Sequence, residues 1–245
     1  MIRYKLTLEY DGRAFVGWQR QTNGLSVQAA LEEAVLRFCG ETVAAVAAGR
    51  TDAGVHATGQ VAQIDLAREI PTDTLRNALN FYLKPLPAAV LAAEPAPEGF
   101  HARFSAVLRR YRYRIVNRRA PLVLDVGRAW RVPQPLDAEA MHSAAQHLVG
   151  RHDFTSFRAS LCQAPSPLKT LDLLAVERQG EEIVVRTEAR SFLHHQVRNM
   201  VGSLKLVGEG RWSDTDLVRA LEARDRRAAG PTAPATGLYL IEVRY

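Results

Sequence analysis

The sequence predicts an α+β fold built from two halves that share the element order β-α-β-β-α-β. Runs in which apolar and polar residues alternate are typical of half-buried strands. They occur between segments whose apolar residues recur at the spacing of an amphipathic helix. A stretch at 93–100 holds two prolines, one glycine and no periodicity. We therefore expect a first domain at residues 1–100 and a second at residues 101–245.

The elements of the first half follow from local signals. We expect a strand at 2–10, a helix that Ser26 caps and Gly40 ends, strands at 43–48 and 59–66, a helix that Thr72 or Asp73 caps and Pro85 and Pro87 end, and a strand at 90–93. This order is that of a ferredoxin-like, or split β-α-β, domain.

The second half repeats this order with an additional helix. We expect a strand at 104–117, a helix capped by Asp137, a hairpin of strands at 168–178 and 182–191, helices at 194–207 and from Ser213, and a final strand at 237–245. Two ferredoxin-like halves can set their sheets side by side and leave a central cleft, which is a common place for a ligand site.

The charge of the chain is distributed unevenly. Residues 1–100 hold 9 Lys and Arg against 11 Asp and Glu, a net charge of −2, whereas residues 101–245 hold 23 against 15, a net charge of +8. A basic second half favours a polyanionic partner such as RNA. The alternative is a basic surface that only aids solubility.

Composition excludes several other classes of protein. The two cysteines, Cys39 and Cys162, form no metal-type pair, so we expect neither a structural metal nor a disulfide, and a reducing cytoplasm fits. Residues 1–10 alternate like a strand and lack the apolar core of a signal peptide, and no apolar run approaches membrane-spanning length. We expect no membrane association.

A polar loop that contains Asp52 is the strongest candidate site. It lies between the expected strands at 43–48 and 59–66, and Arg50 and His56 flank the carboxylate. Rigid strands commonly present reactive groups on such a loop, and its glycines allow a ligand to approach the backbone. A tight turn in which Thr and Asp bond their own backbone is the alternative.

Two further stretches have the composition of an RNA-binding surface. The loop at 11–24 carries Phe15 and Trp18 beside Arg13 and Arg20, either facing a ligand or folding back onto the core. The stretch at 101–119 contains seven arginines and no acid. On a strand, Arg110, Arg112 and Arg114 would share one face, and Arg109, Tyr111, Tyr113 and Ile115 the other. Arginine rows follow phosphates and tyrosines stack on bases, although a solvated strand with buried tyrosines is the alternative.

Arg198 is a candidate partner for the carboxylate. It falls close to the apolar stripe of the helix expected at 194–207. Arginine is rarely buried without an acidic partner, and Asp52 is one candidate. The alternative is a side chain at the edge of the stripe that reaches water. His194 and His195 are not expected to bind metal, because adjacent residues on a helix point apart.

Five stretches of this sequence, in order, resemble the TruA family of tRNA pseudouridine synthases. They include D-G-R-A-F-V-G-W-Q-R-Q from residue 11, G-R-T-D-A-G-V-H-A-T-G-Q-V from residue 49, H-A-R-F-S-A-V-L-R-R-Y-R-Y from residue 101 and F-L-H-H-Q-V-R-N-M-V-G from residue 192. Ala57 and Lys169 depart from residues common in that family, but neither is a predicted site residue.

The resemblance implies a pseudouridine synthase fold and a reaction without cofactor or metal. It implies that Asp52 is the nucleophile, that Arg198 pairs with it, that Tyr111 stacks on the target uridine, and that Arg50 assists base flipping. The substrates would be uridines 38, 39 and 40 in the anticodon stem-loop of tRNA, bound in the central cleft of a homodimer.

Two other classes of function remain open on the residues alone. An RNA-binding module would need the basic strand but not Asp52. A nucleoside hydrolase would normally need a second catalytic carboxylate, and the next acid after Asp52 is Asp65, some way along the outgoing strand.

Overall fold

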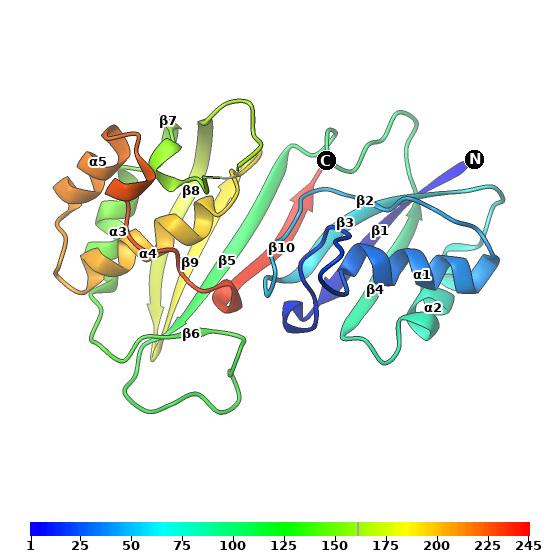
Figure 1. The fold of residues 1–245 in the computed structure, drawn as a ribbon, viewed down its shortest axis with the longest axis horizontal. Coiled ribbons are helices and arrows are strands. Elements are labelled where there is room, and N and C mark those ends of the chain that lie inside the picture. The colour runs from blue at the N-terminus through cyan, green and yellow to red at the C-terminus, as the bar shows by residue number, and fades with distance from the viewer. Residues whose placement is uncertain (161) are drawn as a thin grey trace. The chain divides into compact units, whose positions relative to one another are not determined.

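The computed structural model describes residues 1–160 and 162–245, and it divides into two compact units (Figure 1). Unit 1 comprises residues 1–107 and 239–245, and unit 2 comprises residues 108–238. This division differs from the expected one at residues 101–107 and at the final strand. That strand follows the second half in sequence but belongs to unit 1.

Unit 1 contains a sheet in the order β4-β1-β3-β10, with β2 also paired to β3. Its strands are β1 (Ile2–Tyr10), β2 (Val46–Ala47), β3 (His56–Leu66), β4 (Ala88–Pro95) and β10 (Leu238–Arg244). All pairs are antiparallel except β3 with β10. The strand expected at 43–48 is therefore much shorter than predicted.

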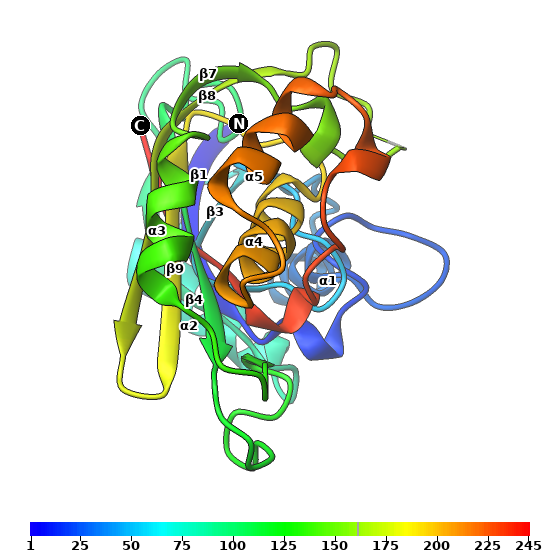
Figure 2. The same cartoon turned by 90° about the vertical axis from the view of Figure 1, so that its left-hand side faces the viewer.

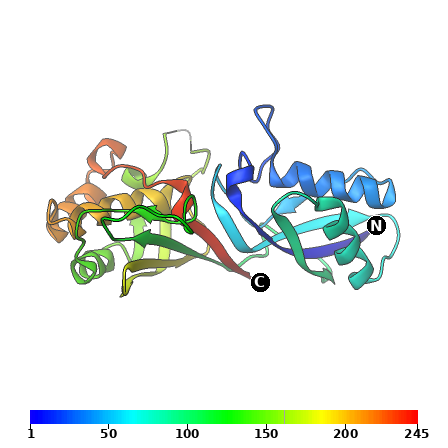
Figure 3. The same cartoon turned by 90° about the horizontal axis from the view of Figure 1, so that it is seen from below.

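Two helices, α1 (Val27–Cys39) and α2 (Thr72–Leu83), pack against each other over this sheet (Figure 3). Ser26 caps α1 by accepting a hydrogen bond from the amide of Ala29, and Gly40 ends it with φ +75°, as predicted. The predicted cap of α2 is wrong, because Pro71 holds the N-cap position without a side-chain bond and Thr72 is already helical. Proline suits a helix start, since it has no amide hydrogen to satisfy.

Phe15 and Trp18 belong to the core of unit 1, so the alternative in which the 11–24 loop folds back is correct. Phe15 is 5% exposed and Trp18 2% exposed, and both rings lie against Tyr10. Burying two large rings removes much apolar surface from water. The aromatic part of this loop therefore anchors it to the sheet.

Unit 2 contains a second sheet in the order β5-β9-β8-β7, with β6 also paired to β5. Its strands are β5 (Leu108–Val116), β6 (Trp130–Arg131), β7 (Gly150–Asp153), β8 (Leu168–Gln179) and β9 (Glu182–Ala189). The β8–β9 hairpin was predicted, whereas β6 and β7 were not.

Unit 2 has three helices (Figure 2). They are α3 (Ala138–Gln146), α4 (Gln196–Gly208) and α5 (Asp214–Glu222), and short 3-10 helices lie at Gly12–Ala14, Thr155–Phe157, Arg226–Ala228 and Ala235–Gly237. Of the three, α3 packs against β8 and against the other two helices. Asp137 caps α3 as predicted, and Ser213 forms a capping box with Asp216 at α5. None of the helices among the described residues has the length and apolarity that crossing a membrane requires.

The start of α4 differs from the prediction. His195 has a left-handed backbone, with φ +63°, and His194 also precedes the helix. The two imidazole rings consequently lie with their centroids 4.0 Å apart. The expectation that they point apart is wrong, because it assumed that both belong to the helix.

Candidate active site

Asp52 lies in the loop between β2 and β3 of unit 1, where exposure alternates along the chain. Arg50 is exposed, Thr51 is buried and Asp52 is half-buried. A turn closes the loop through a hydrogen bond of 3.1 Å from the amide of Val55 to the carbonyl oxygen of Asp52, and Gly54 takes φ +77° there. The carboxylate thus sits on a short, structured turn next to an exposed arginine.

A buried polar network supports this loop from the sheet. The Tyr10 hydroxyl lies 2.8 Å from Oγ1 of Thr51. Nε2 of Gln60 donates to the carbonyl oxygen of Gly49 at 2.8 Å and to the Tyr10 hydroxyl at 3.3 Å. Burial raises the pKa of Tyr10 to about 12, against the opposing effect of the hydrogen bonds with Thr51 and Gln60. The hydroxyl therefore keeps its proton at neutral pH.

The segment that follows β1 supports the loop from another side. The amide of Trp18 donates to the carbonyl oxygen of Thr51 at 3.0 Å. Gly17 has φ +108°, and a Cβ built there would lie 2.7 Å from that same oxygen and 3.2 Å from the carbonyl carbon of Asp52. Only glycine fits this close approach between the two backbones.

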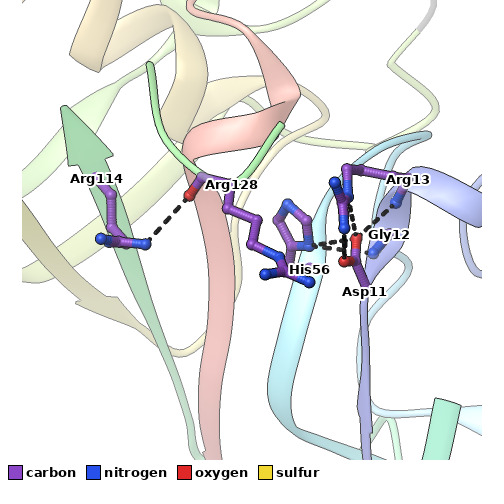
Figure 4. A network of polar contacts seen from close by, with 6 residues as sticks. All are labelled: Asp11, Gly12, Arg13, His56, Arg114 and Arg128. Carbon is purple, nitrogen blue, oxygen red and sulfur yellow. Dashed lines mark hydrogen bonds and ion pairs between the residues drawn. The ribbon is translucent and has the colours of Figure 1, made fainter. Parts of the chain in front are cut away.

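A cluster of charged side chains, formed by Asp11, Arg13 and His56, lies next to the loop (Figure 4). Arg13 binds Asp11 with both Nε and Nη2, and Nδ1 of His56 lies 3.2 Å from Oδ1 of Asp11. The His56 ring stacks on Tyr239 of β10 with a centroid distance of 4.6 Å. Burial opposes ionisation of Asp11, but the hydrogen bonds of Arg13 and the charge of His56 outweigh it and lower the pKa of Asp11 to about 2. Asp11 is therefore ionised at neutral pH.

Both arginines predicted in the 11–24 loop form ion pairs within unit 1. Arg13 pairs with Asp11 at 2.5 Å, and Arg20 pairs with Glu32 of α1 at 2.5 Å. Each arginine remains exposed. Their predicted contact with RNA stays a prediction.

The basic strand of unit 2 has the predicted two-sided pattern. Along β5 the arginines at 110, 112 and 114 are half-buried, and the alternating residues Arg109, Tyr111, Tyr113 and Ile115 are buried. The Tyr111 ring meets Phe192 edge-on at 5.2 Å. Tyr113 is fully buried and donates to the carbonyl oxygen of Pro234 at 2.7 Å, which marks it as a structural residue.

The arginine row is nevertheless balanced by acids. Arg110 pairs with Glu188 at 2.7 Å, and Arg114 pairs with Glu182 at 2.7 Å, both glutamates being contributed by β9. Arg114 also pairs with Asp125 and reaches the carbonyl oxygen of Arg128 (Figure 4). The stretch at 101–119 contains no acid itself, and these acids come from a neighbouring strand about 70 residues later. Arg112 instead faces Arg186 in the register.

Arg198 lies in the first turn of α4 in unit 2 and is half-buried. Its Nε donates to the carbonyl oxygen of Ala233 at 2.8 Å, and the amide of Ala233 donates to the carbonyl oxygen of Arg198 at 3.1 Å. Arg50 and Asp52 share one loop of unit 1, whereas Tyr111 and Arg198 belong to unit 2. A pair of Asp52 with Arg198 stays a prediction.

Asp65, the candidate for a second carboxylate, has a different place. It pairs with Arg3 through Oδ1 at 2.7 Å and Oδ2 at 2.8 Å. The hydrogen bonds from Arg3 lower the pKa of Asp65, against the effect of burial. The register joins Arg3 to Asp65 and Tyr10 to Ala57, so Asp65 lies at the opposite end of β3 from the Asp52 loop. At about 3.3 Å per residue this is on the order of 25 Å away, too far for a pair of catalytic carboxylates.

Three residues that contact or support the loop were missed by sequence reasoning. Tyr10 and Gln60 lie within strands, where their side chains read as part of an alternating pattern, and Gly17 is one glycine among several in a loop. Gln60 shares alternating strand positions with Ala62, Ile64 and Leu66, and a polar residue next to this apolar run was the available signal, because buried amides need partners.

Comparisons with known proteins bear on this site. The chain matches the family model described as tRNA pseudouridine synthase over residues 7–105 and 144–245. It is similar to tRNA pseudouridine synthase A of Rhodospirillum centenum, at 67% identity over the whole of both chains. The protein of that name from Paramagnetospirillum magneticum is 66% identical over all of this chain and 96% of its own length, and that from Xanthobacter autotrophicus is 63% identical over the whole of both. The first matched region includes the Asp52 loop, and the second includes Arg198.

Proposed function

We propose a specific role and target for this chain, which belongs to the tRNA pseudouridine synthase family and is therefore an isomerase that converts uridine to pseudouridine in tRNA. Asp52 is the nucleophile in this proposal, and the targets are uridines 38, 39 and 40 of the anticodon stem-loop. The role of Asp52 is supported by its position as a half-buried carboxylate inside the matched region. The preceding residue, Thr51, is held by the Tyr10 hydroxyl from the sheet and by the Trp18 amide from the segment after β1. The choice of uridines rests on the resemblance to the TruA family.

The reaction exchanges one bond of the base for another. The bond from ribose C1′ to N1 of uracil breaks, a bond from C1′ to C5 forms, the C5 proton is lost and N1 gains a proton. The product is an isomer of the substrate, so the reaction requires no oxidant or reductant. A carboxylate can attack C1′ of the ribose or C6 of the base, or remove a sugar proton. Each route requires that the target base leave its stack.

The remaining predicted residues complete the proposed site. Arg198 pairs with the Asp52 carboxylate and keeps it ionised and aimed. Tyr111 stacks on the target uracil, and exposed Arg50 occupies the place that the base leaves or holds its phosphate. In this proposal the chain has two ferredoxin-like halves whose sheets lie side by side around a central RNA-binding cleft. The order β4-β1-β3-β2 in unit 1, with every pair antiparallel, supports a ferredoxin-like first half.

The RNA backbone is bound by exposed or half-buried arginines in this proposal. They are Arg13 and Arg20 of the loop after β1, and Arg110, Arg112 and Arg114 of β5. Because several already form ion pairs, each would exchange a carboxylate for a phosphate on binding. The enzyme acts as a cytoplasmic homodimer in the same proposal, as the resemblance implies.

A tritium-release assay tests the proposal. A tRNA transcript whose uridines carry tritium at C5 releases tritium to water when the new bond forms. We expect release by the native protein and none by Asp52→Asn. Asp65→Asn is the matched control, since it removes a carboxylate at the opposite end of β3 from the Asp52 loop, and it should leave the chemistry intact. Sequencing of the product then shows which uridines were converted.

Other outcomes would overturn particular parts of the proposal. Native release by Asp52→Asn removes the role of Asp52. If the native protein liberates free uracil instead of tritium, and if Asp65→Asn also loses this uracil release, the protein would be a hydrolase. Tight tRNA binding without release by the native protein would indicate an RNA-binding module.

A further inference from the structure

We propose that Tyr10 is a positioning residue for the reaction, which acts on Asp52 through the hydroxyl of Thr51, with Gln60 fixing the other side of the same loop. This inference rests on the proposed role of Asp52. It assigns a role in the reaction to a side chain that lies beneath the loop.

The hydrogen bonds run from Gln60 to Tyr10 and from Tyr10 to Thr51, so each residue donates toward the Asp52 loop. Nε2 of Gln60 donates both to the Tyr10 hydroxyl and to the carbonyl oxygen of Gly49, and these two bonds use both of its hydrogens. The Tyr10 hydroxyl, having accepted from Gln60, has its own proton available for Oγ1 of Thr51 at 2.8 Å. Gly49 and Thr51 are thus held on either side of Arg50, directly before Asp52.

Burial makes these bonds difficult to replace. Tyr10 is 4% exposed, Thr51 6% and Gln60 0%, so water cannot readily take the place of a missing partner. Removal of the hydroxyl leaves an amide hydrogen of Gln60 and Oγ1 of Thr51 unsatisfied in an apolar surrounding, and the loop must move to find other partners.

The backbone of β1 aims Tyr10 at the loop. The register of β1 against β3 shifts between Leu8 and Tyr10, so that Tyr10 lies opposite Ala57 rather than Thr58. Irregularities of this kind bend a strand and redirect a side chain, and they occur often beside active sites. The protonation state of Tyr10 supports the same role, since burial raises the pKa of Tyr10 to about 12 and the hydroxyl therefore remains a hydrogen-bond donor at neutral pH.

Tyr4 provides a matched control on the same strand. Its hydroxyl accepts from the amide of Ile70 at 2.7 Å and donates to the carbonyl oxygen of Ile70 at 2.8 Å. It is 1% exposed and belongs to the same face of β1, six residues before Tyr10. Tyr4→Phe therefore removes an equally buried tyrosine hydroxyl with two hydrogen bonds, but away from the Asp52 loop.

The test measures kcat and KM for tritium release by Tyr10→Phe, Tyr4→Phe and Asp52→Asn, together with their Tm. Because a misplacement of 1 Å can cost about 100-fold in rate, we expect Tyr10→Phe to lower kcat by about 10- to 100-fold with KM changed less than about twofold. Tyr4→Phe should lower Tm by a similar amount and leave kcat within about twofold.

Thr51 variants separate positioning from general stability. Thr51→Ser keeps the hydroxyl and should keep most of kcat, whereas Thr51→Val should lose as much as Tyr10→Phe. If Tyr10 acts through Thr51, the double variant Tyr10→Phe/Thr51→Val should be no slower than either single variant, since both remove the same support.

The outcomes distinguish this inference from the proposed function. If Asp52→Asn is inactive while Tyr10→Phe keeps native kcat, the inference is overturned and the role of Asp52 stands. If Asp52→Asn is active, both fail. If Tyr10→Phe unfolds, Thr51→Val carries the test, and native kcat in that variant overturns the inference.

Discussion

Gly17 offers a steric test of how firmly the Asp52 loop must be held. In Gly17→Ala the new Cβ would lie 2.7 Å from the carbonyl oxygen of Thr51, whereas ordinary contacts begin at 3.4 Å, so the two backbones must separate by about 0.7 Å. If 1 Å of misplacement costs about 100-fold in rate, this shift corresponds to roughly a 20-fold loss. We expect that loss in kcat for tritium release, measured in single turnovers with enzyme in excess so that product release does not limit the rate.

Gly99→Ala is the matched control for this experiment. Gly99 also has a left-handed backbone, with φ +72°, but a Cβ there meets no atom within 4 Å. Both variants carry the cost of a left-handed alanine, roughly 1–2 kcal/mol of folding free energy, and only Gly17→Ala displaces the Asp52 loop. Equal kcat values for the two variants at a temperature where both are folded would refute the positional reasoning.

Three further predictions concern charge and pH. The pKa of Asp11 is about 2 in the folded protein and about 3.8 in the unfolded chain. Ionised Asp11 therefore stabilises the fold fully above about pH 4, and this contribution is lost as the pH falls through about 2. In urea unfolding experiments, the free energy of unfolding of Asp11→Asn should decline by up to about 2 kcal/mol less than that of the native protein over that range. The raised pKa of Tyr10 makes the unfolding free energy fall between about pH 10 and 12, and Tyr10→Phe should remove that part of the fall in the same titration. Arg110→Gln should weaken tRNA binding and reduce the slope of log Kd against log salt by about one, whereas exposed Arg37→Gln on α1 should change neither; equal slopes would remove Arg110 from the RNA interface.

Signals that depend only on neighbouring residues were read correctly from the sequence. Ser26 caps α1 as predicted because a cap requires only a hydroxyl and the amide of the third residue on. The alternation along β5 was also correct, since a strand with one buried face fixes which residues point inward.

Features that depend on distant partners were not predictable. The glutamates that neutralise Arg110 and Arg114 are on β9, and no local pattern of β5 indicates them. The last strand pairs with β3, where Tyr239 lies opposite His56, and this contact joins residues about 180 positions apart. Phe15 lies in a loop without periodicity, so its sequence neighbours could not decide between core and surface.

The site divides in the same way. Asp52 and Arg50 could be proposed as site residues because a reactive loop between strands has a recognisable composition, and the comparisons established the family. Tyr10 and Gln60 were missed because a residue that supports a loop from below has the pattern of an ordinary core position. Their role depends on which hydroxyl and which carbonyl oxygen they reach in the folded chain.

The alternation of exposure in the loop separates the residue that anchors it, Thr51, from the residues that it presents, Arg50 and Asp52. Thr51 is buried and receives the support of Tyr10, whereas Arg50 is exposed and Asp52 is half-buried on either side of it. The buried Thr51 therefore anchors one side of the loop, and Arg50 and Asp52, the groups that we propose meet RNA, are accessible on the other. A change at the anchor can therefore move Asp52 while the arginines of β5 and of the 11–24 loop, which we propose bind the RNA backbone, stay in place. Loss of kcat at constant KM is the signature expected of such a change, and a parallel rise in KM would show that anchor and binding surface are not separate.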